Sequence, residues 1–210
     1  MTDILLSVPS DSPEARPVFA GLVEEYGKRY NKDGGPPRSV ESEIAAYPPA
    51  LFHPPLGDFL ILQRDGETIA GGAFMSHDDE TVEIKRIWTH PGLRRQGLSR
   101  RIMAALEDRA AELGYTRAYL TTGHRQPEAQ KLYLSHGYHA FFGLSDDLSL
   151  YGSLPFEKRI GRAAGQVPER ARRIPSASPE DAAEVVTAIK AAQAELIFAR
   201  LARHQERRSA

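Results

Sequence analysis

The sequence predicts an α/β (α+β) fold in which one mixed sheet carries helices on both of its faces. Strand patterns at residues 59–63, 69–75 and 82–89 follow one another with only short turns between them. Helical patterns at 99–113 and 127–136 then alternate with further strand patterns. Consecutive hairpin strands followed by alternating helices and strands predict a sheet covered on both sides.

The N-terminal part of the chain predicts a strand, a helix and a long irregular segment. Ile4–Val8 has the composition of a strand,. Asp11 or Ser12 ahead of Pro13 is a helix-start signal. Residues 31–55 are rich in proline, glycine and charge, which predicts a loop with a short helix,.

Two turns join the three consecutive strands. Asp65 and Gly66 form a hairpin signal, because both residue types tolerate the left-handed conformation of a tight hairpin turn. Residues 78–80 are acidic and make the next turn. The strand at 82–89 is therefore expected to be the third antiparallel strand in a row.

Glycines mark the ends of both predicted central helices. Gly114 follows the first helix and Gly137 caps the second,. Tyr138–Leu144 and Pro155–Ile160 are then expected to be the closing strands of the sheet.

Residues 83–103, EIKRIWTHPGLRRQGLSRRIM, run from a strand through a basic turn straight into a helix. A helix start has N–H groups without backbone partners and carries the positive end of the helix dipole, so it attracts phosphate. Gly97 lets the main chain approach an anion closely, and Arg94 and Arg95 add positive charge. A solvated helix start is the alternative interpretation of such a turn.

Three blocks of sequence, taken in order, point to one family. Residues 94–99, RRQGLS, resemble the pyrophosphate loop R-x-x-G-x-G/A, and residues 87–91, IWTHP, precede that loop as a strand ending in proline. Residues 126–138, QPEAQKLYLSHGY, resemble the segment N-x-x-A-x-x-L-Y-x-x-x-G-F/Y. Together they resemble the GCN5-related N-acetyltransferases, the GNAT superfamily, and a bacterial subgroup with a T-G-x-x-Q-P-E-A stretch. The resemblance covers residues 4–160.

The resemblance implies a GNAT fold, with a mixed, mostly antiparallel central sheet, a splayed central strand pair and helices on both faces. It implies that Ile87 and Thr89 bind the pantetheine arm of acetyl-CoA and that residues 94–99 bind its pyrophosphate, mainly through the backbone. The candidate cofactor-binding residues are Ile87, Trp88, Thr89, Arg94, Arg95, Gln96, Gly97, Leu98, Ser99, Gln126 and Tyr133.

Two positions depart from the family pattern. Ser99 stands where the family usually has glycine or alanine, and Gln126 stands where many members have asparagine. Serine is small, so the loop is expected to survive. Glutamine makes the same kinds of amide hydrogen bond with a longer reach, and it is expected to have a structural role that also shapes the cofactor site.

Tyr133 and Glu83 are the candidate catalytic residues. Tyr133 lies at the family's tyrosine position, which implies that its phenol protonates the departing thiolate; the alternative is a core tyrosine beside Leu132. Glu83 lies near the start of the central strand, where an acidic residue serves many relatives as general base. Its alternatives are a solvated strand residue and a residue that binds the substrate amine.

Histidines and metals have no expected part in the chemistry. His90 and His124 are expected to be ordinary loop residues, although imidazole titrates near neutrality. The alternative for His124 is a contact with the acceptor or CoA, because it follows a strand whose end borders the expected acyl pocket. The seven histidines show no zinc-like spacing and cysteine is absent, so no metal is expected,.

The composition predicts a cytoplasmic enzyme. The 210 residues are 41% hydrophobic and 26% charged, and the formal net charge is −1, so no basic excess indicates a nucleic-acid partner,. No apolar stretch approaches membrane-spanning length, and the first residues do not resemble a signal peptide,.

Three segments are expected along the chain: an acetyltransferase domain at 1–160, a linker at 161–177 and an amphipathic helix at 178–208. Ser178 is the predicted N-cap of that helix. Its apolar stripe needs a partner, which is either its own domain or another copy, and a homodimer contact is the favoured interpretation.

These observations predict an acetyl-CoA-dependent N-acetyltransferase that acts on a primary amine of a small molecule or peptide. The absence of cysteine favours direct transfer in a ternary complex over a cysteine-borne acyl intermediate,. Two alternatives are a non-catalytic acyl-CoA-binding regulatory module and an acyltransferase with a longer acyl-CoA donor.

Overall fold

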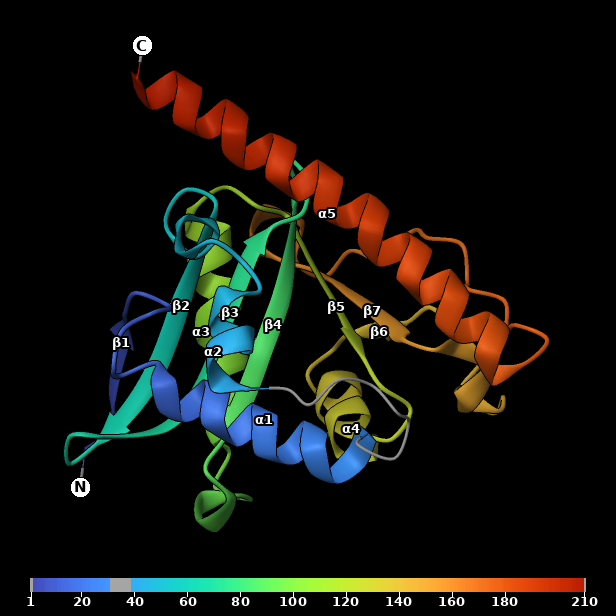
Figure 1. Cartoon of the computed structure of the whole chain (residues 1–210), viewed down its shortest axis with the longest axis horizontal. Coiled ribbons are helices and arrows are strands. Elements are labelled where there is room, and N and C mark those ends of the chain that lie inside the picture. Colours follow the sequence, from blue (N-terminus) through green and yellow to red (C-terminus); the bar gives the residue numbers. More distant parts are fainter. Residues whose placement is uncertain (1, 31–38, 210) are drawn as a thin grey trace. The chain divides into compact units, whose positions relative to one another are not determined.

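A computed structural model describes residues 2–30 and 39–209 of the chain. Within these residues, seven strands form one sheet in the order β1-β2-β3-β4-β5-β7-β6 (Figure 1). The strands are β1 (Ile4–Ser7), β2 (Gly57–Arg64), β3 (Glu67–Ser76), β4 (Thr81–Thr89), β5 (Arg117–Thr122), β6 (His139–Ala140) and β7 (Leu154–Arg159). The helices are α1 (Arg16–Tyr30), α2 (Val40–Ala45), α3 (Leu98–Glu112), α4 (Pro127–Ser135) and α5 (Pro179–Ser209).

The sheet is mixed and mostly antiparallel, as the sequence predicts. Antiparallel pairs join β1 to β2, β2 to β3, β5 to β7 and β6 to β7. The backbone N–H of His90, just after β4, donates to the carbonyl of Ile69 at the start of β3 over 2.8 Å, so these strands are also antiparallel. Residues 81–83 of β4 pair in parallel with residues 117–119 of β5.

The chain forms two compact units that divide within β4. The first unit comprises residues 1–75 and 84–113, and the second comprises 76–83 and 114–210. The boundary in β4 lies between Glu83 and Ile84. The start of β4 therefore belongs with β5, and its remainder belongs with β3.

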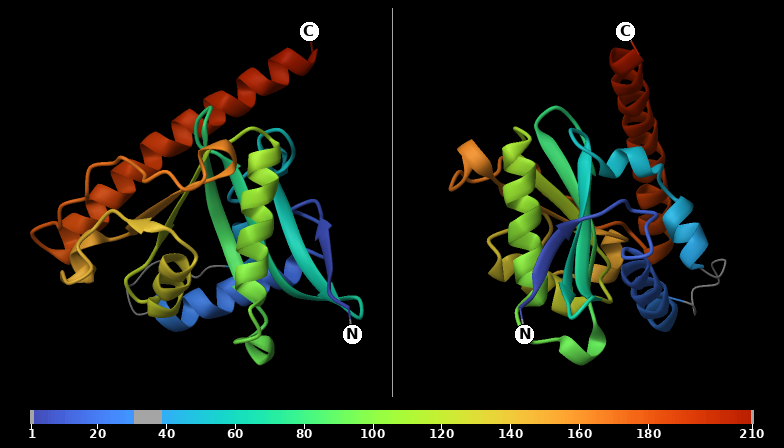
Figure 2. Two further views of the ribbon diagram at one scale, coloured as in Figure 1. Left: turned by 180° about the vertical axis from the view of Figure 1, so that it is seen from behind. Right: turned by 90° about the vertical axis from the view of Figure 1, so that its left-hand side faces the viewer.

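In the first unit, helices cover both faces of the sheet: α3 lies on one face, and α1 and α2 lie on the other (Figures 1 and 2). Two neighbouring glycines of β3 allow this close approach. A Cβ on Gly71 would lie 2.6 Å from Val18 of α1, and a Cβ on Gly72 would lie 2.9 Å from Ile102 and Leu106 of α3. Because successive residues of a strand face opposite sides, both helices pack against backbone at these positions.

The second unit is built around the buried residues of β5 and β7. The Phe156 ring of β7 lies 5.6 Å from the Tyr133 ring of α4. Glu157, the next residue, is fully buried and accepts from Arg117 of β5 over 3.0 Å. A buried carboxylate needs such a partner, and this pair holds β5 and β7 together.

The segment predicted as a linker, residues 161–177, makes specific contacts within the second unit. The Arg173 guanidinium donates to the backbone carbonyl of Ser153 over 2.8 Å. The Arg170 guanidinium lies 3.7 Å from Glu157 and 4.7 Å from the centre of the Tyr119 ring.

The C-terminal helix α5 starts and packs as an amphipathic helix. The Ser178 hydroxyl accepts from the backbone N–H of Asp181 over 3.1 Å, which confirms the predicted cap,. Ala182 and Ile197 are buried, whereas Leu196 is 62% exposed. Part of the apolar stripe therefore packs on its own chain, at a short 3₁₀ turn (Leu148–Tyr151). None of the described helices is both long and apolar enough to cross a membrane.

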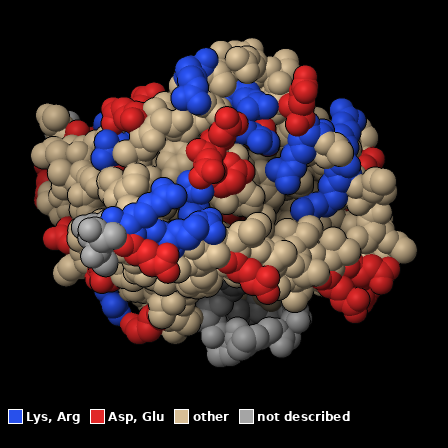
Figure 3. All heavy atoms as spheres, turned by 90° about the horizontal axis from the view of Figure 1, so that it is seen from above, with Lys and Arg blue, Asp and Glu red and all other residues tan. Residues whose placement is uncertain are grey.

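The last turns of α5 carry arginines that lie near acidic groups of the same unit. Arg200 forms an ion pair with Asp79, which lies in the turn between β3 and β4. Figure 3 shows Lys and Arg side chains gathered beside Asp and Glu side chains on one face of the molecule.

Two predicted elements have different bounds in the structure. The helix expected from Pro13 begins only at Arg16, because the Ser12 side chain accepts from the backbone N–H of Ala15 in a separate turn. Residues 31–38 of the predicted irregular segment lie outside the described residues, and the rest contains α2 and a 3₁₀ turn (Pro49–Phe52).

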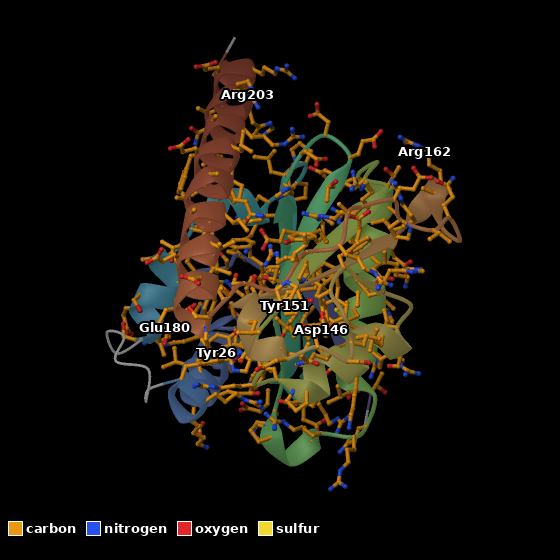
Figure 4. All side chains as sticks on the ribbon, turned by 90° about the vertical axis from the view of Figure 1, so that its right-hand side faces the viewer. Tyr26, Asp146, Tyr151, Arg162, Glu180 and Arg203 are labelled. Atoms are coloured by element: carbon orange, nitrogen blue, oxygen red, sulfur yellow. The ribbon has the colours of Figure 1, made fainter. Side chains whose placement is uncertain are left out.

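The closing strand expected at 138–144 is also shorter than predicted, since β6 contains only two residues, His139 and Ala140. A side-chain bond network bends the chain away from the sheet after β6. The backbone N–H of Gly143 donates to the Tyr151 hydroxyl over 3.2 Å, and that hydroxyl donates to Asp146, beside which it lies in Figure 4. Burial of the phenol raises the pKa of Tyr151, and the hydrogen bond with the Asp146 carboxylate raises it further,.

Candidate functional site

The turn between β4 and α3, residues 90–97, lies in the first unit and contains most of the segment, 94–99, for which the sequence predicts pyrophosphate binding; we call this turn the phosphate loop. A 3₁₀ turn (Pro91–Leu93) follows β4 directly. The Nδ1 atom of His90 accepts from the backbone N–H of Gly92 over 3.2 Å, so this histidine orders the turn. Residues 94–97 are exposed, whereas Leu98 is buried and anchors the start of α3.

Two left-handed residues shape the phosphate loop. Arg95 has a φ of +65° and Gly97 has a φ of +76°. Gly97 is the N-cap of α3, and among the described residues no side chain caps the helix there. The first helical bond at this end joins the Arg101 N–H to the Gly97 carbonyl over 3.0 Å. The N–H groups of Leu98 and Ser99 precede this bond at the helix start, where the helix itself supplies no acceptor and an anion can bind.

Ser99 ties the helix start to the end of β4. Its hydroxyl lies 2.7 Å from the Thr89 hydroxyl, at hydrogen-bonding distance. The serine that departs from the family pattern thus has a structural use in this chain. The bond fixes the end of the strand relative to the phosphate loop.

The arginines of the phosphate loop are partly paired with acids from distant parts of the chain. Arg94 lies 2.9 Å from Glu25 of α1. Arg101 pairs with Asp3, which also accepts from Arg64 over 2.7 Å. The hydrogen bond from Arg64 is the main reason that the pKa of Asp3 lies below its ordinary value,. The pairing of Glu25 with Arg94 and of Asp3 with Arg101 could not be predicted from sequence spacing, because the partners lie 69 and 98 residues apart.

The other candidate residues of β4 in this unit differ in exposure. Trp88 is buried, and a Cβ on Gly21 of α1 would lie 1.8 Å from its indole nitrogen, so the ring packs against that helix. Ile87 is partly buried, and its Cδ1 would lie 2.5 Å from a Cβ on Gly72. A cofactor contact by either residue would involve the backbone rather than the side chain.

Sequence reasoning missed Arg86, which lies beside these residues on β4. Its side chain is only 7% exposed and forms an ion pair with Glu43 of α2 over 3.3 Å. Burial lowers the pKa of Arg86, and the Glu43 carboxylate opposes that shift,. The only sequence signal was a charged residue inside a strand pattern.

The second unit contains the remaining candidates. Tyr133 is 8% exposed, and its ring lies 5.6 Å from Phe156 and 6.0 Å from Tyr138. Glu83 is 5% exposed and lies opposite Tyr119 of β5, so it is not a solvated surface residue. Both side chains combine an ionisable group with burial, which is typical of structural and catalytic residues alike.

Gln126 closes the turn between β5 and α4. Its side-chain carbonyl accepts from the Thr122 hydroxyl over 2.8 Å and from the backbone N–H of Gly123 over 3.2 Å. Glutamine at this position thus connects the end of the strand to the start of the helix. His124 lies in the same turn, and its backbone carbonyl accepts from Gln130 over 3.3 Å.

The order of the strands and the central helices agrees with one family of proteins. Residues 20–138 match the acetyltransferase (GNAT) family, and the chain belongs to that family.

Individual relatives share the fold at low identity. The chain is 24% identical over 131 residues to the uncharacterized N-acetyltransferase YjgM of Escherichia coli (strain K12), covering 61% of this chain and 76% of that protein. The structure of PaiA N-acetyltransferase from Thermoplasma acidophilum in complex with coenzyme A has a TM-score of 0.57 and 14% identity, over 76% of this chain and 99% of that one. The ribosomal-protein-S18-alanine N-acetyltransferase from Escherichia coli has a TM-score of 0.53 and 17% identity, over 80% and 100%.

Proposed function

We propose that this protein is an acetyl-CoA-dependent N-acetyltransferase that transfers the acetyl group directly to a primary amine of a small molecule or peptide. The observation that carries the proposal is the uncapped start of α3. Its N-cap Gly97 is left-handed, residues 94–97 are exposed, and the loop lies within residues 20–138, which match a family of acetyltransferases. A helix start of this kind binds phosphate through backbone N–H groups and the helix dipole.

The phosphate loop, the end of β4 and two ionisable residues have defined parts in the proposed reaction. The backbone of residues 94–99 binds the pyrophosphate, and the backbone of Ile87 to Thr89 binds the pantetheine amides. The amine nitrogen attacks the thioester carbonyl carbon, so that a C–N bond forms and the C–S bond breaks. Glu83 takes a proton from the amine, directly or through water, and Tyr133 gives a proton to the departing thiolate.

The acceptor site, location and assembly of the protein are further parts of the proposal. We expect the 31–55 segment to contribute to the acceptor site and the protein to be cytoplasmic. The exposed apolar residues of α5, Val185, Leu196 and Phe198, are consistent with a homodimer contact,. In this proposal, residues 1–160 form the acetyltransferase domain, and 161–177 connect it to the helix at 178–208.

The test is release of CoA from acetyl-CoA in the presence of a panel of amines and peptides. We expect Tyr133→Phe to lower kcat about 100-fold or more, because general acid catalysis typically contributes that much. Acetyl-CoA affinity, measured by calorimetry, should stay within twofold of the native value. Tyr138→Phe is the matched control, since Tyr138 is a buried tyrosine whose ring neighbours Tyr133. Equal kcat in Tyr133→Phe and the native chain would contradict the assignment of the acid.

A second candidate function is a non-catalytic acyl-CoA-binding module. The aromatic surroundings of Tyr133 favour it, because Phe156 and Tyr138 both lie against the ring and a core tyrosine has such neighbours. Tight acetyl-CoA binding without turnover on any amine of the panel would support the module. Turnover with a longer acyl-CoA in place of acetyl-CoA would instead revise the donor.

A further inference from the structure

Arg86 adopts a conformation that is unusual inside a strand. Its φ is +60°, in the left-handed region that non-glycine residues rarely occupy,. The other described non-glycine residues with positive φ, Asp65 and Arg95, lie in turns. A left-handed residue within a strand interrupts the regular ladder and redirects the backbone groups that follow it. The residues that follow here are Ile87 to Thr89.

Three aromatic rings surround the Arg86 guanidinium. Its central carbon lies 4.8 Å from the centre of the Phe19 ring and 5.7 Å from the centres of the Tyr47 and Phe52 rings. The rings come from α1 and from the segment between α2 and β2. A desolvated guanidinium is attracted to the faces of aromatic rings, so this cage stabilises the cation where water is excluded.

Glu43 of α2 completes the surroundings of the guanidinium through two contacts. Arg86 donates to the Glu43 backbone carbonyl over 2.8 Å and to its carboxylate over 3.3 Å. The helix that carries Glu43 is short, and a capping box of Ser39 and Ser42 closes its start. A second ion pair, between Glu41 and Arg16, joins it to α1 over 2.5 Å. The contacts of Arg86 therefore connect α2 directly to the irregular point of β4.

We propose that Arg86 is a positioning residue: its caged side chain, paired with Glu43, holds the left-handed break in β4 and fastens α2 to that strand. The inference rests on the proposed function in one respect, because Ile87 to Thr89 are expected to bind the pantetheine arm. The left-handed conformation is unfavourable for an arginine, so contacts of its side chain must compensate for it. Without them, the strand regains a regular backbone and the backbone groups of Ile87 to Thr89 change direction.

A purely structural arginine in a core cage is the competing interpretation. It predicts that loss of Arg86 lowers thermal stability without a selective effect on the backbone of β4 or on acetyl-CoA. Two measurements distinguish the interpretations. Amide hydrogen exchange of the ligand-free protein reports on residues 84–90 and 39–46, and calorimetry reports on the Kd of acetyl-CoA.

Four variants make the test specific. Arg86→Met keeps an unbranched side chain in the cage but removes the charge and the bonds to Glu43, whereas Arg86→Gly permits the left-handed conformation without a side chain. Glu43→Gln removes the negative charge that pairs with Arg86 and keeps a side chain of similar shape. Lys85→Met is the matched control. Lys85 is the neighbour of Arg86 in β4, and its ammonium lies 5.2 Å from the centre of the Tyr47 ring, which also contacts Arg86.

We expect Arg86→Met to accelerate exchange at least tenfold in both segments and to raise the Kd of acetyl-CoA at least fivefold. Glu43→Gln should accelerate exchange in 39–46 alone and leave the Kd within twofold, and Lys85→Met should change neither. Native exchange in 84–90 together with a native Kd in Arg86→Met would overturn the proposal.

Two further outcomes are decided in advance. If Arg86→Met does not fold, Arg86→Gly carries the test. Glycine tolerates the left-handed conformation, so residues 39–46 are then the readout: we expect faster exchange there because α2 loses its contacts with Arg86, and native exchange in 39–46 would overturn the role of Arg86 in fastening α2. If the native chain does not bind acetyl-CoA, the proposed function fails. The exchange rates of the ligand-free variants then still support or overturn the role of Arg86 in holding β4 and α2.

Discussion

The start of α3 and the end of α5 are both rich in arginine, yet they differ in what the positive charge does. Arg94 and Arg95 precede α3, and Arg100 and Arg101 lie in its first turn. The positive end of the helix dipole lies at this helix start, so positive side chains are unfavourable there. The arginines of α5 lie near its C-terminus, where the helix dipole favours positive charge. Asp79, in the same unit, forms an ion pair with Arg200, and the charges of Arg203 and Arg207 also contribute to lowering the pKa of Asp79.

The two helices also differ at their N-termini. Ser178 accepts from an N–H of the first turn of α5, so part of the donor capacity there is used within the chain,. Gly97 has no side chain to do this for α3, and the described residues supply no other cap. The start of α3 has arginines at an unfavourable helix end, of which Arg94 and Arg101 pair with acids, and no side-chain cap from the described residues, which favours an anion there; at the end of α5 the helix dipole itself favours the arginines,. The position of the arginines on each helix, rather than their number, distinguishes the proposed ligand site from the end of α5.

The largest expected effect comes from placing a negative charge in the phosphate loop. Gly97→Asp should weaken acetyl-CoA binding about 100-fold, because a carboxylate beside the pyrophosphate adds a repulsion of about 3 kcal/mol. Calorimetric titration at fixed ionic strength measures the change. Gly97→Asn is the control of equal shape, and both residue types tolerate the left-handed conformation. If the two variants bind acetyl-CoA equally well, the pyrophosphate does not lie at this helix start.

The opposite result is expected at the capped start of α5. Ser178→Ala should lower the free energy of unfolding by about 1 kcal/mol through loss of the cap, with no change in acetyl-CoA affinity. Denaturant unfolding and calorimetry measure the two quantities. Ser178→Asp should restore stability, since aspartate is an equally good N-cap. A weaker acetyl-CoA affinity in Ser178→Ala would break the distinction between the two helix starts.

A smaller effect is expected from the bond that ties α3 to β4. Ser99→Ala removes the contact with Thr89 and should weaken acetyl-CoA binding about threefold, which corresponds to about 0.7 kcal/mol. The fold should be unchanged, because alanine is common at this position in the family. Calorimetry of the variant beside Ser135→Ala, a serine on α4, checks the magnitude. Unchanged affinity would show that the bond does not position the loop.

The smallest expected effect concerns the ion pair between Asp79 and Arg200. The hydrogen bond from Arg200 lowers the pKa of Asp79 below its ordinary value. Because the folded-state pKa is the lower one, the pair stabilises the fold above about pH 4 and loses this contribution as the pH falls through the lowered pKa. Asp79→Asn should therefore lower the thermal midpoint slightly at pH 7 and not at all well below pH 3.

Salt gives an independent check of the same pair. The Asp79 side chain is 93% exposed, so the difference between the two proteins at pH 7 should also shrink as ionic strength rises,. A difference that persists at low pH and in high salt would mean that Asp79 acts through something other than its charge. A group other than the Asp79 carboxylate would then have to balance the positive charge of the arginines at the end of α5.

Local features of the chain were predictable because neighbouring residues produce them. The hairpin at Asp65 and Gly66, the cap at Ser178 and the left-handed Gly97 each depend on a few consecutive residues. The phosphate loop is of the same kind, since a turn and a helix start define its geometry. The sequence by itself therefore determined the fold class and the place of the proposed cofactor site.

Only the tertiary structure decided which charges are paired and which elements are cut short. Arg86 lies 43 residues from Glu43, and Arg94 lies 69 residues from Glu25. The strand expected at 138–144 ends after Ala140 because the side chains of Tyr151 and Asp146 close the following loop. Burial and ion pairing arise when distant segments pack together, and a local sequence pattern contains no information on which segments will meet.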